Sequence, residues 1–210
     1  WKSDGTESGT VMVKNTSALL YNSQTSGFVI GNTLLFFTYQ LDGEESLCDL
    51  WKSDGTESGT VTIRTFNCSG SFSEYQGSVV LDDTLFFSAF ENNTGRELWK
   101  SDGTESGTMM VKDIGTFSNQ LQIGQELTVF GNQVFFTMSD DNSKEILWKS
   151  DGTESGTVMF KDLSFSSDPG VPSQLTPSLN KMYFTTNPDH ILWSGNTIHM
   201  VEISYDIYLS

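Results

Sequence analysis

The sequence predicts an all-β fold, and within it a β-propeller of four-stranded antiparallel blades, with about 48–50 residues per repeat. Two observations lead to this prediction. The phrase WKSDGTESGT occurs four times without a substitution, and self-similarity at such a period indicates a repeat architecture. No segment places apolar residues at a helical period over the length of a helix. The four copies begin at Trp1, Trp51, Trp99 and Trp148, and a weaker fifth copy, ILWSGNTIHMV, contains Trp193.

Each unit contains four short segments of strand length, always in the same order. A weak apolar stretch comes first, an aromatic run second, a segment that leads into the phrase third, and a segment that follows the phrase fourth. Apolar, β-branched and aromatic runs of this length are typical of strands. The aromatic runs are 35–38, 85–88, 134–137 and 182–185, and the segments that follow the phrase are 11–14, 61–64, 109–112 and 158–161.

Two turns divide the strands of a unit. Gly31-Asn32, Asp82-Asp83, Gly131-Asn132 and Leu179-Asn180 separate the first two strands, which predicts a tight hairpin. The phrase itself predicts a second hairpin, because its Gly residues can adopt positive φ and its Asp can bond the backbone of its own turn.

Adjacent phenylalanines indicate how the sheets pack. Neighbouring strand residues point to opposite faces, so Phe36 and Phe37 can both be buried only where both faces of the sheet are covered. A two-sheet sandwich covers one face of each sheet, whereas blades packed around a ring cover both. A β-solenoid is the competing repeat fold, but its coils are about half as long.

The chain resembles a known repeat family. Residues 95–104 read GRELWKSDGT and are followed by Gly107-Thr108, which is similar to the motif of the ELWxxDGT repeat family. Only this copy has the full Gly-Arg-Glu-Leu-Trp lead. The resemblance implies β-propeller repeats, a place in large secreted or surface proteins of bacteria, and no assigned catalytic residues.

The repeat boundaries predict a single propeller domain over residues 1–210. It comprises a partial repeat at 1–14 and repeats at about 15–64, 65–112, 113–161 and 162–202. Residues 203–210 are expected to close a five-bladed ring beside the hairpin of 1–14, or to link to further sequence. Two alternatives remain: the chain is a stretch of a longer repeat array, or a neighbouring subunit closes the ring. Because the first residue is Trp rather than Met, we expect sequence to precede it.

Charge excludes some partners. Eleven basic residues against 27 acidic ones give a formal net charge of −16. Nucleic acid is not expected as a partner because phosphate binding needs a basic patch, and the lack of an 18-residue apolar run predicts no membrane insertion. The acidic, polar composition suits a secreted or cell-surface protein. Two repeat positions hold basic residues that we expect to pair locally: Lys2, Lys52, Lys100 and Lys149, and Lys14, Arg64, Lys112 and Lys161.

The two cysteines and three sequons offer covalent sites. The midpoint between Cys48 and Cys68 is position 58, within the turn at 54–59, so they should lie nearly opposite each other and form a disulfide, as suits an oxidising compartment. Two buried free thiols are the alternative. Asn15, Asn67 and Asn92 begin Asn-x-Ser/Thr triplets and are glycosylation candidates if the source is eukaryotic.

The repeated acidic residues and tryptophans each have two interpretations. The carboxylates of Asp4, Asp54, Asp102 and Asp151 would share one rim and could bind calcium, which prefers oxygen ligands. The favoured alternative is that each Asp bonds its own turn, so no cofactor is expected beyond possible calcium. Trp1, Trp51, Trp99, Trp148 and Trp193 could form a sugar-stacking platform, but we favour packing anchors between blades, with their N–H groups bound by a neighbouring turn.

The sequence offers almost no catalytic group. The histidines, His190 and His199, lack metal-ligand spacing, and no nucleophile–base pair is suggested. We therefore expect no enzyme, but a non-catalytic structural or adhesive repeat module of an extracellular surface protein or appendage. Its partners would be further copies of itself or another extracellular protein or glycan. The alternative is a carbohydrate-binding, lectin-like propeller, assisted by calcium.

Overall fold

The computed structural model describes residues 1–16, 19–20, 27–42, 45–67, 77–114, 123–139, 145–162, 171–178, 181–187 and 203–204. All regular structure in these residues is β-strand, and every strand pair is antiparallel, which confirms the all-β prediction. The strands are β1 (Leu19–Leu20), β2 (Phe28–Ile30), β3 (Thr33–Asp42), β4 (Glu45–Ser53), β5 (Val61–Asn67), β6 (Ser78–Leu81), β7 (Thr84–Glu91), β8 (Gly95–Ser101), β9 (Met109–Met110), β10 (Ile123–Phe130), β11 (Gln133–Ser139), β12 (Glu145–Ser150), β13 (Val158–Asp162), β14 (Val171–Ser178), β15 (Lys181–Asn187) and β16 (Ile203–Ser204).

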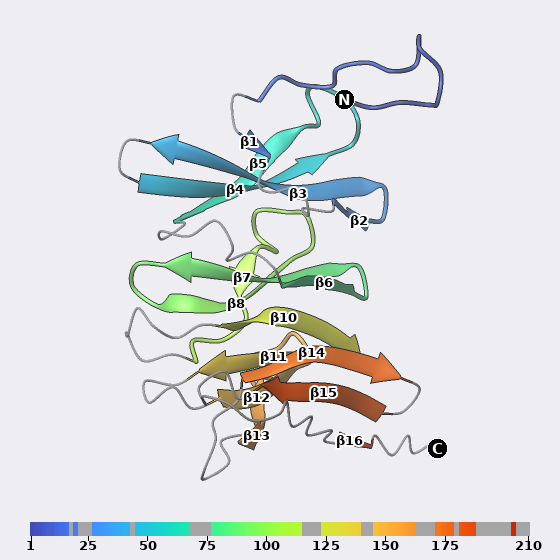
Figure 1. Ribbon diagram of the computed structural model, residues 1–210. Helices are drawn as coiled ribbons and strands as arrows, with labels where there is room; N and C mark the ends of the chain where they lie inside the picture. Colours follow the sequence, from blue (N-terminus) through green and yellow to red (C-terminus); the bar gives the residue numbers. More distant parts are fainter. Residues whose placement is uncertain are drawn as a thin grey trace, which may run out of the picture.

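The sheets are stacked in chain order along one axis (Figure 1). Three successive groups each hold four antiparallel strands, and we call them the first unit (β2–β5), the second unit (β6–β9) and the third unit (β10–β13). The first two units join into one sheet through the single pair Asn67↔Phe90. A last sheet contains β14, β15 and β16.

The two ends of the stack lie far apart. The N-terminal hairpin (residues 1–14), in which Lys2 pairs with Val11, lies at one end, and β14 and β15 lie at the other (Figure 1). Residues 203–210 were expected beside this hairpin. They are described only at Ile203 and Ser204, which pair with β15 instead. The described residues therefore form an open stack rather than a ring.

Adjacent phenylalanines are buried on opposite faces in the second and third units, as the sequence predicts, whereas only one member of the pair Phe36-Phe37 is buried. Phe87 (0% exposed) packs toward the first unit, where its ring meets that of Phe37 edge-on at 5.3 Å. Phe86 (3% exposed) belongs to the core between the second and third units. Each buried ring contributes about 1.5–3 kcal/mol of hydrophobic stabilisation. Phe36 is only half-buried and stacks on Trp51 at 6.2 Å; among the described residues, the N-terminal hairpin rather than a complete four-stranded unit lies above the first unit (Figure 1).

The turns between first and second strands follow two geometries. Gly31 (φ 57°) and Gly131 (φ 59°) have positive φ at the first turn position, where glycine has no steric cost. In the second unit this turn is formed by Asp82 (φ 47°) and Asp83 (φ 55°), so two side-chain-bearing residues occupy the left-handed region.

Candidate functional site

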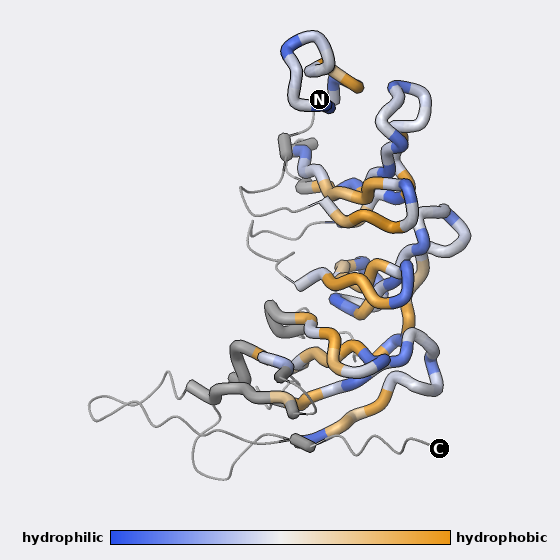
Figure 2. Tube along the Cα trace, turned by 90° about the vertical axis from the view of Figure 1, so that its right-hand side faces the viewer, coloured by the Kyte–Doolittle hydropathy of each residue, from blue (hydrophilic) through white to orange (hydrophobic). Residues whose placement is uncertain are grey.

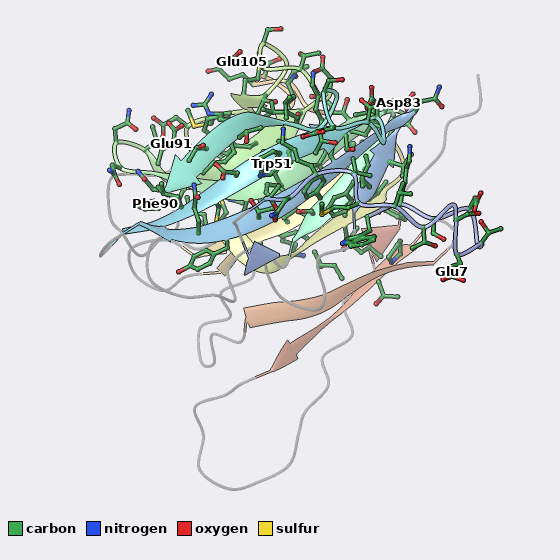
Figure 3. The ribbon with its side chains drawn as sticks, turned by 90° about the horizontal axis from the view of Figure 1, so that it is seen from above. Glu7, Trp51, Asp83, Phe90, Glu91 and Glu105 are labelled. Carbon is green, nitrogen blue, oxygen red and sulfur yellow. The ribbon has the colours of Figure 1, made fainter. Side chains whose placement is uncertain are left out.

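The four copies of the phrase form four loops of the same structure, which we call the loop ladder (residues 3–10, 53–60, 101–108 and 150–157). The three loops at 53–60, 101–108 and 150–157 project from one side of the stack, one below the other (Figure 2). Seen along the stack, Glu7 and Glu105 both lie at the outside of the molecule and are displaced around it (Figure 3). The ladder therefore turns gradually about the stack.

Each loop is held by hydrogen bonds among its own side chains and backbone. In the third copy, Asp102 Oδ1 accepts the Thr104 backbone N–H at 2.8 Å and the Thr104 hydroxyl at 2.7 Å. Thr104 Oγ1 in turn accepts the Gly107 N–H at 2.9 Å. The hydroxyls of Ser101 and Thr108 bond each other at 2.7 Å and join the two ends of the loop. The same bonds recur in the other three copies.

These bonds stabilise the ionised aspartates. The hydroxyl of the following Thr, and then its backbone N–H, lower the pKa of each Asp from its ordinary value because both donate to the carboxylate.

Two glycines of each loop are required by its geometry. Gly103 has φ 86°, a conformation that side-chain-bearing residues rarely adopt. Gly107 is required because of limited space: a Cβ at this position would lie 2.1 Å from Asp102 Oδ1. The loop thus needs a residue without a side chain where its chain passes the Asp carboxylate.

The aspartate geometry agrees with the turn-bonding alternative. Asp4, Asp54, Asp102 and Asp151 each bind their own turn. In the described part of the chain, no group of three or more His, Cys, Asp or Glu residues could hold a metal ion. Calcium binding stays a prediction.

The repeat-locked basic residues do not pair locally, contrary to the prediction. Five of the eight donate to backbone carbonyls of the next loop along the stack. The lysine after the Trp reaches a glycine carbonyl: Lys2 Nζ bonds Gly55 O at 2.9 Å, and Lys100 Nζ bonds Gly152 O at 2.7 Å. The basic residue that ends the fourth segment reaches a threonine carbonyl: Lys14 Nζ to Thr60 O at 2.7 Å, Lys112 Nζ to Thr157 O at 2.8 Å, and Arg64 Nη1 to Thr108 O at 3.5 Å.

A β-bulge accompanies this second set of contacts. Between β4 and β5 the register shifts, so that Thr62 pairs with Trp51 and Arg64 with Leu50, which leaves Ile63 as the extra residue. A bulge redirects the side chains beside it. Ile63 is buried in the core (8% exposed), and the next side chain, Arg64, reaches the second unit. The same shift leaves Phe160 as the extra residue in β13.

Arg64 makes a denser contact than the lysines at its repeat position. Its guanidinium forms a 2.5 Å ion pair with Glu91, which lies at the end of β7 beside Phe90 (Figure 3). The guanidinium carbon also lies 4.4 Å from the ring centroid of Trp99, within cation–π range.

The tryptophans differ in how far they are covered. Trp99 is buried (3% exposed) and meets Phe66 edge-on at 5.1 Å, Trp51 and Trp148 are half-buried, and Trp1 is 80% exposed. Trp193 lies outside the described residues. A neighbouring turn was expected to bind the indole N–H groups, which is wrong for Trp51: its N–H donates to the Thr38 hydroxyl at 2.8 Å, on the adjacent strand. The buried Nε1 atoms of Trp99 and Trp148 have no partner among the described residues.

The covalent candidates are placed in part. Cys48 is buried in β4 and disulfide-bonded, and its predicted partner, Cys68, lies outside the described residues. Asn15 is exposed, and Asn92 is exposed at the turn between β7 and β8. Asn67 is half-buried at the end of β5 and pairs with Phe90. His190 and His199 lie outside the described residues.

Sequence reasoning missed two buried carboxylates. Asp49 (5% exposed) accepts hydrogen bonds from the Thr65 hydroxyl at 2.5 Å and the Gln40 side chain at 3.3 Å. Glu97 (0% exposed), at the same repeat position, accepts the Ile114 backbone N–H at 3.1 Å. The signal was an acidic residue two positions before the Trp, in a segment that is otherwise apolar.

No protein-family model and no curated protein matches the sequence. Among solved structures, the chain is similar to a putative hydrolase from Bacteroides ovatus, with 7% identity and a TM-score of 0.35 over 78% of this chain and 53% of that one. It is also similar to a GH43 endo-arabinanase from Bacillus licheniformis, with 12% identity and a TM-score of 0.32 over 85% of this chain and 71% of that one. The chain thus spans about half the length of the putative hydrolase.

Both of these proteins are named as enzymes, which contradicts the expectation that the chain is not an enzyme, and we withdraw that expectation. At TM-scores below 0.5 the likeness assigns no activity, substrate or catalytic residue to this chain. In the part of the chain that the structure describes, no helix is long and apolar enough to span a membrane.

Proposed function

We propose that the chain is a structural and adhesive repeat module of an extracellular surface protein, and that its blades are of the propeller type. The observation that carries this proposal is the loop ladder: four identical loops, each rigid through its own hydrogen bonds, at the outside of one stack. A chain that presents the same surface several times suits attachment to a repetitive or extended partner.

The loops divide into an internal and an external set of groups. Asp, Thr and Gly are used within the loop, and Lys connects it to the next one. One glutamate and one serine per loop are exposed, and the serine hydroxyl makes a long 3.4 Å bond to the Thr hydroxyl of its own loop. These residues are Glu7, Glu57, Glu105 and Glu154, with Ser8, Ser58, Ser106 and Ser155. Each loop therefore offers a partner the same carboxylate and hydroxyl in the same geometry.

Repetition converts weak contacts into firm attachment. Once one loop has bound, the others are held near the partner at high effective concentration, and avidity can exceed a single affinity by about 10²–10⁴. The lysine bonds between loops support this, since they fix the spacing. A partner with repeated groups, another extracellular protein or a glycan, would gain most.

An extracellular place has separate support. Cys48 is disulfide-bonded, and disulfides persist mainly in oxidising compartments. The net charge of −16 and the resemblance to the ELWxxDGT repeat family agree with a secreted or cell-surface location. The carbohydrate-binding alternative gains no support from the tryptophans, because Trp51, Trp99 and Trp148 are half-buried or buried and do not form an open stacking platform.

The test is attachment of the intact chain to polysaccharide and protein films, measured by quartz crystal microbalance. The loop variant Glu57→Gln/Glu105→Gln/Glu154→Gln should attach much more weakly than the wild type. The matched control Asp82→Asn/Asp83→Asn/Asp113→Asn removes the same charge from exposed positions outside the loops and should attach like the wild type. Equal loss in both variants, or no attachment of the wild type, would overturn the proposal.

A further inference from the structure

Each loop of the loop ladder contains an Asp-Gly pair, a dipeptide at which protein chains readily rearrange. The pairs are Asp4-Gly5, Asp54-Gly55, Asp102-Gly103 and Asp151-Gly152, and all four aspartates are exposed to water. The loop cannot avoid this pair, because Gly55 has φ 84° and the carboxylate of Asp54 closes the turn. We propose that the hydrogen bonds of each loop protect its Asp-Gly bond from conversion to isoaspartate.

The rearrangement is an attack of the backbone on a side chain. The glycine nitrogen forms a bond to the Asp Cγ, the carboxyl hydroxyl leaves, and it departs as water with the amide proton. Glycine favours this attack because it has no Cβ to hinder the approach. A water molecule then opens the cyclic imide at the former main-chain carbonyl, so that the chain runs through the side chain as isoaspartate. One water leaves and one enters, and no oxidant or reductant is needed.

The loop holds the carboxylate in a form that does not react. Asp54 Oδ1 accepts the Thr56 backbone N–H at 2.8 Å and the Thr56 hydroxyl at 2.7 Å. The carboxyl must be protonated for its oxygen to leave as water, whereas both donors favour the ionised form and lower the pKa of Asp54. The chain at Gly59 passes directly against the same oxygen, because a Cβ there would lie 2.1 Å from Asp54 Oδ1. The carboxylate is therefore kept both ionised and fixed in place.

The attacking nitrogen is bound as well. The Gly55 N–H donates to Ser53 Oγ at 3.1 Å, and the Ser53 hydroxyl bonds that of Thr60 across the loop at 2.7 Å. The nitrogen must lose its proton to attack, so its bond to Ser53 has to break first. Because Ser53 and Thr60 are buried, the serine is held in position to accept this bond. The same bond recurs in the other loops, from Gly5 to Ser3, from Gly103 to Ser101 and from Gly152 to Ser150.

An isoaspartate would damage more than its own loop. It adds a methylene group to the main chain between Asp and Gly, so the glycine carbonyl has to move. Gly55 O and Gly152 O accept the bonds from Lys2 and Lys100 that join successive loops. A single rearranged bond would therefore loosen one loop and its contact with the preceding repeat. This inference goes beyond the proposed function, since the protection does not depend on which partner the loops bind.

The chain supplies an internal control for the test. Trypsin cleaves after the basic residues that flank each loop, which releases the four loops as peptides of different sequence: 3–14, 53–64, 101–112 and 150–161. The intact chain is aged in warm neutral buffer, folded or unfolded in guanidinium chloride, and isoaspartate in each peptide is measured by chromatography with electron-transfer fragmentation. Because the reaction must break hydrogen bonds to a charged group, we expect the folded loops to react at least about tenfold more slowly. Equal rates would overturn the proposal.

Variants of one loop separate its own bonds from the stability of the whole chain. Thr56→Val removes the hydroxyl that binds the aspartate, and Ser53→Ala frees the glycine N–H. Each should raise isoaspartate in the peptide of that loop about tenfold, relative to the same variant unfolded, while the other three loops stay protected. The matched control Thr62→Val makes the same change at an exposed position of the same peptide outside the loop, and it should have no effect. No rise with either loop variant, or an equal rise in all four peptides, would overturn the proposal.

Discussion

Replacing Arg64 tests whether the contact between the first and second units depends on the guanidinium or only on positive charge. Three of the four copies of this repeat position hold Lys (Lys14, Lys112 and Lys161), so Arg64→Lys installs the residue that the repeat otherwise uses. The substitution removes the 2.5 Å pair with Glu91 and the stacking of the guanidinium on Trp99. In exchange, a lysine could reach Thr108 O as Lys112 reaches Thr157 O, at 2.8 Å, where Arg64 now has a long bond of 3.5 Å.

The magnitudes favour arginine. A partly exposed ion pair contributes about 0.2–1 kcal/mol, and the side chains of Arg64 and Glu91 are 37% and 28% exposed. A cation–π contact contributes about 0.5–2 kcal/mol, toward the upper end when desolvated. A shorter hydrogen bond from the new lysine to Thr108 O would contribute about 1 kcal/mol to the free energy of unfolding. We therefore expect Arg64→Lys to reduce the free energy of unfolding by about 1 kcal/mol, and Arg64→Met by about 2 kcal/mol.

Urea unfolding followed by tryptophan fluorescence measures these changes, because Trp99 lies against Arg64. A double-mutant cycle of Arg64→Met with Glu91→Gln should give a coupling of about 0.5–1 kcal/mol for the pair. The matched control is Lys112→Arg at the same repeat position of the next unit, which should not gain stability, because Lys112 forms no ion pair with any of the described residues. A stability of Arg64→Lys equal to the wild type, with zero coupling to Glu91, would refute the reasoning.

Three other predictions concern the turns, the aspartates and the disulfide. Asp83→Gly should raise the free energy of unfolding by about 0.5–1 kcal/mol, because glycine relieves the positive φ of 55°; thermal melts check this, with Asp113→Gly as a control that should not stabilise. The aspartates of the loops have lowered pKa values, so their contribution to stability is complete above the unfolded pKa of about 3.9 and is lost as the pH falls through the lower folded values. Asp102→Asn/Asp151→Asn should accordingly flatten the fall in melting temperature below about pH 4, and an unchanged acid slope would contradict this. Reduction of the Cys48 disulfide should cost about 2–4 kcal/mol, measured as a lower urea midpoint in reductant, and an unchanged midpoint would show that the bond adds nothing.

Local chemistry made part of this structure predictable. The Gly and Asp of the phrase indicated a turn closed by its own side chains, and the loops at 101–108 and its counterparts fold in that way. The adjacent phenylalanines indicated sheets covered on both faces: the rings of Phe86 and Phe87 lie in different cores, while Phe36 beside the buried Phe37 is only half-buried. In both cases the information lies within a few neighbouring residues.

The partners of long polar side chains were not predictable in the same way. The sequence shows where a lysine or arginine stands but not which group accepts its hydrogen bond. Here the acceptors are backbone carbonyls 44 to 53 residues away, and no residue type in the sequence identifies them. The bulges that leave Ile63 and Phe160 unpaired were equally hidden, since an extra residue in a strand is visible only against its partner. The buried partner of an indole N–H, such as Thr38 for Trp51, also depends on register.

The choice of backbone carbonyls as acceptors explains how one phrase can recur unchanged between differing strands. The bond from a lysine to Gly55 O or Gly152 O depends only on the backbone conformation of the next loop. That conformation is set by the Asp, Thr and Gly residues of the loop itself. Where these bonds form, they therefore depend on the loops and not on the side chains of the strands between them. Such an interface can be repeated with each added unit. A protein built in this way gains length by adding units, and its exposed glutamates and serines are repeated with each one.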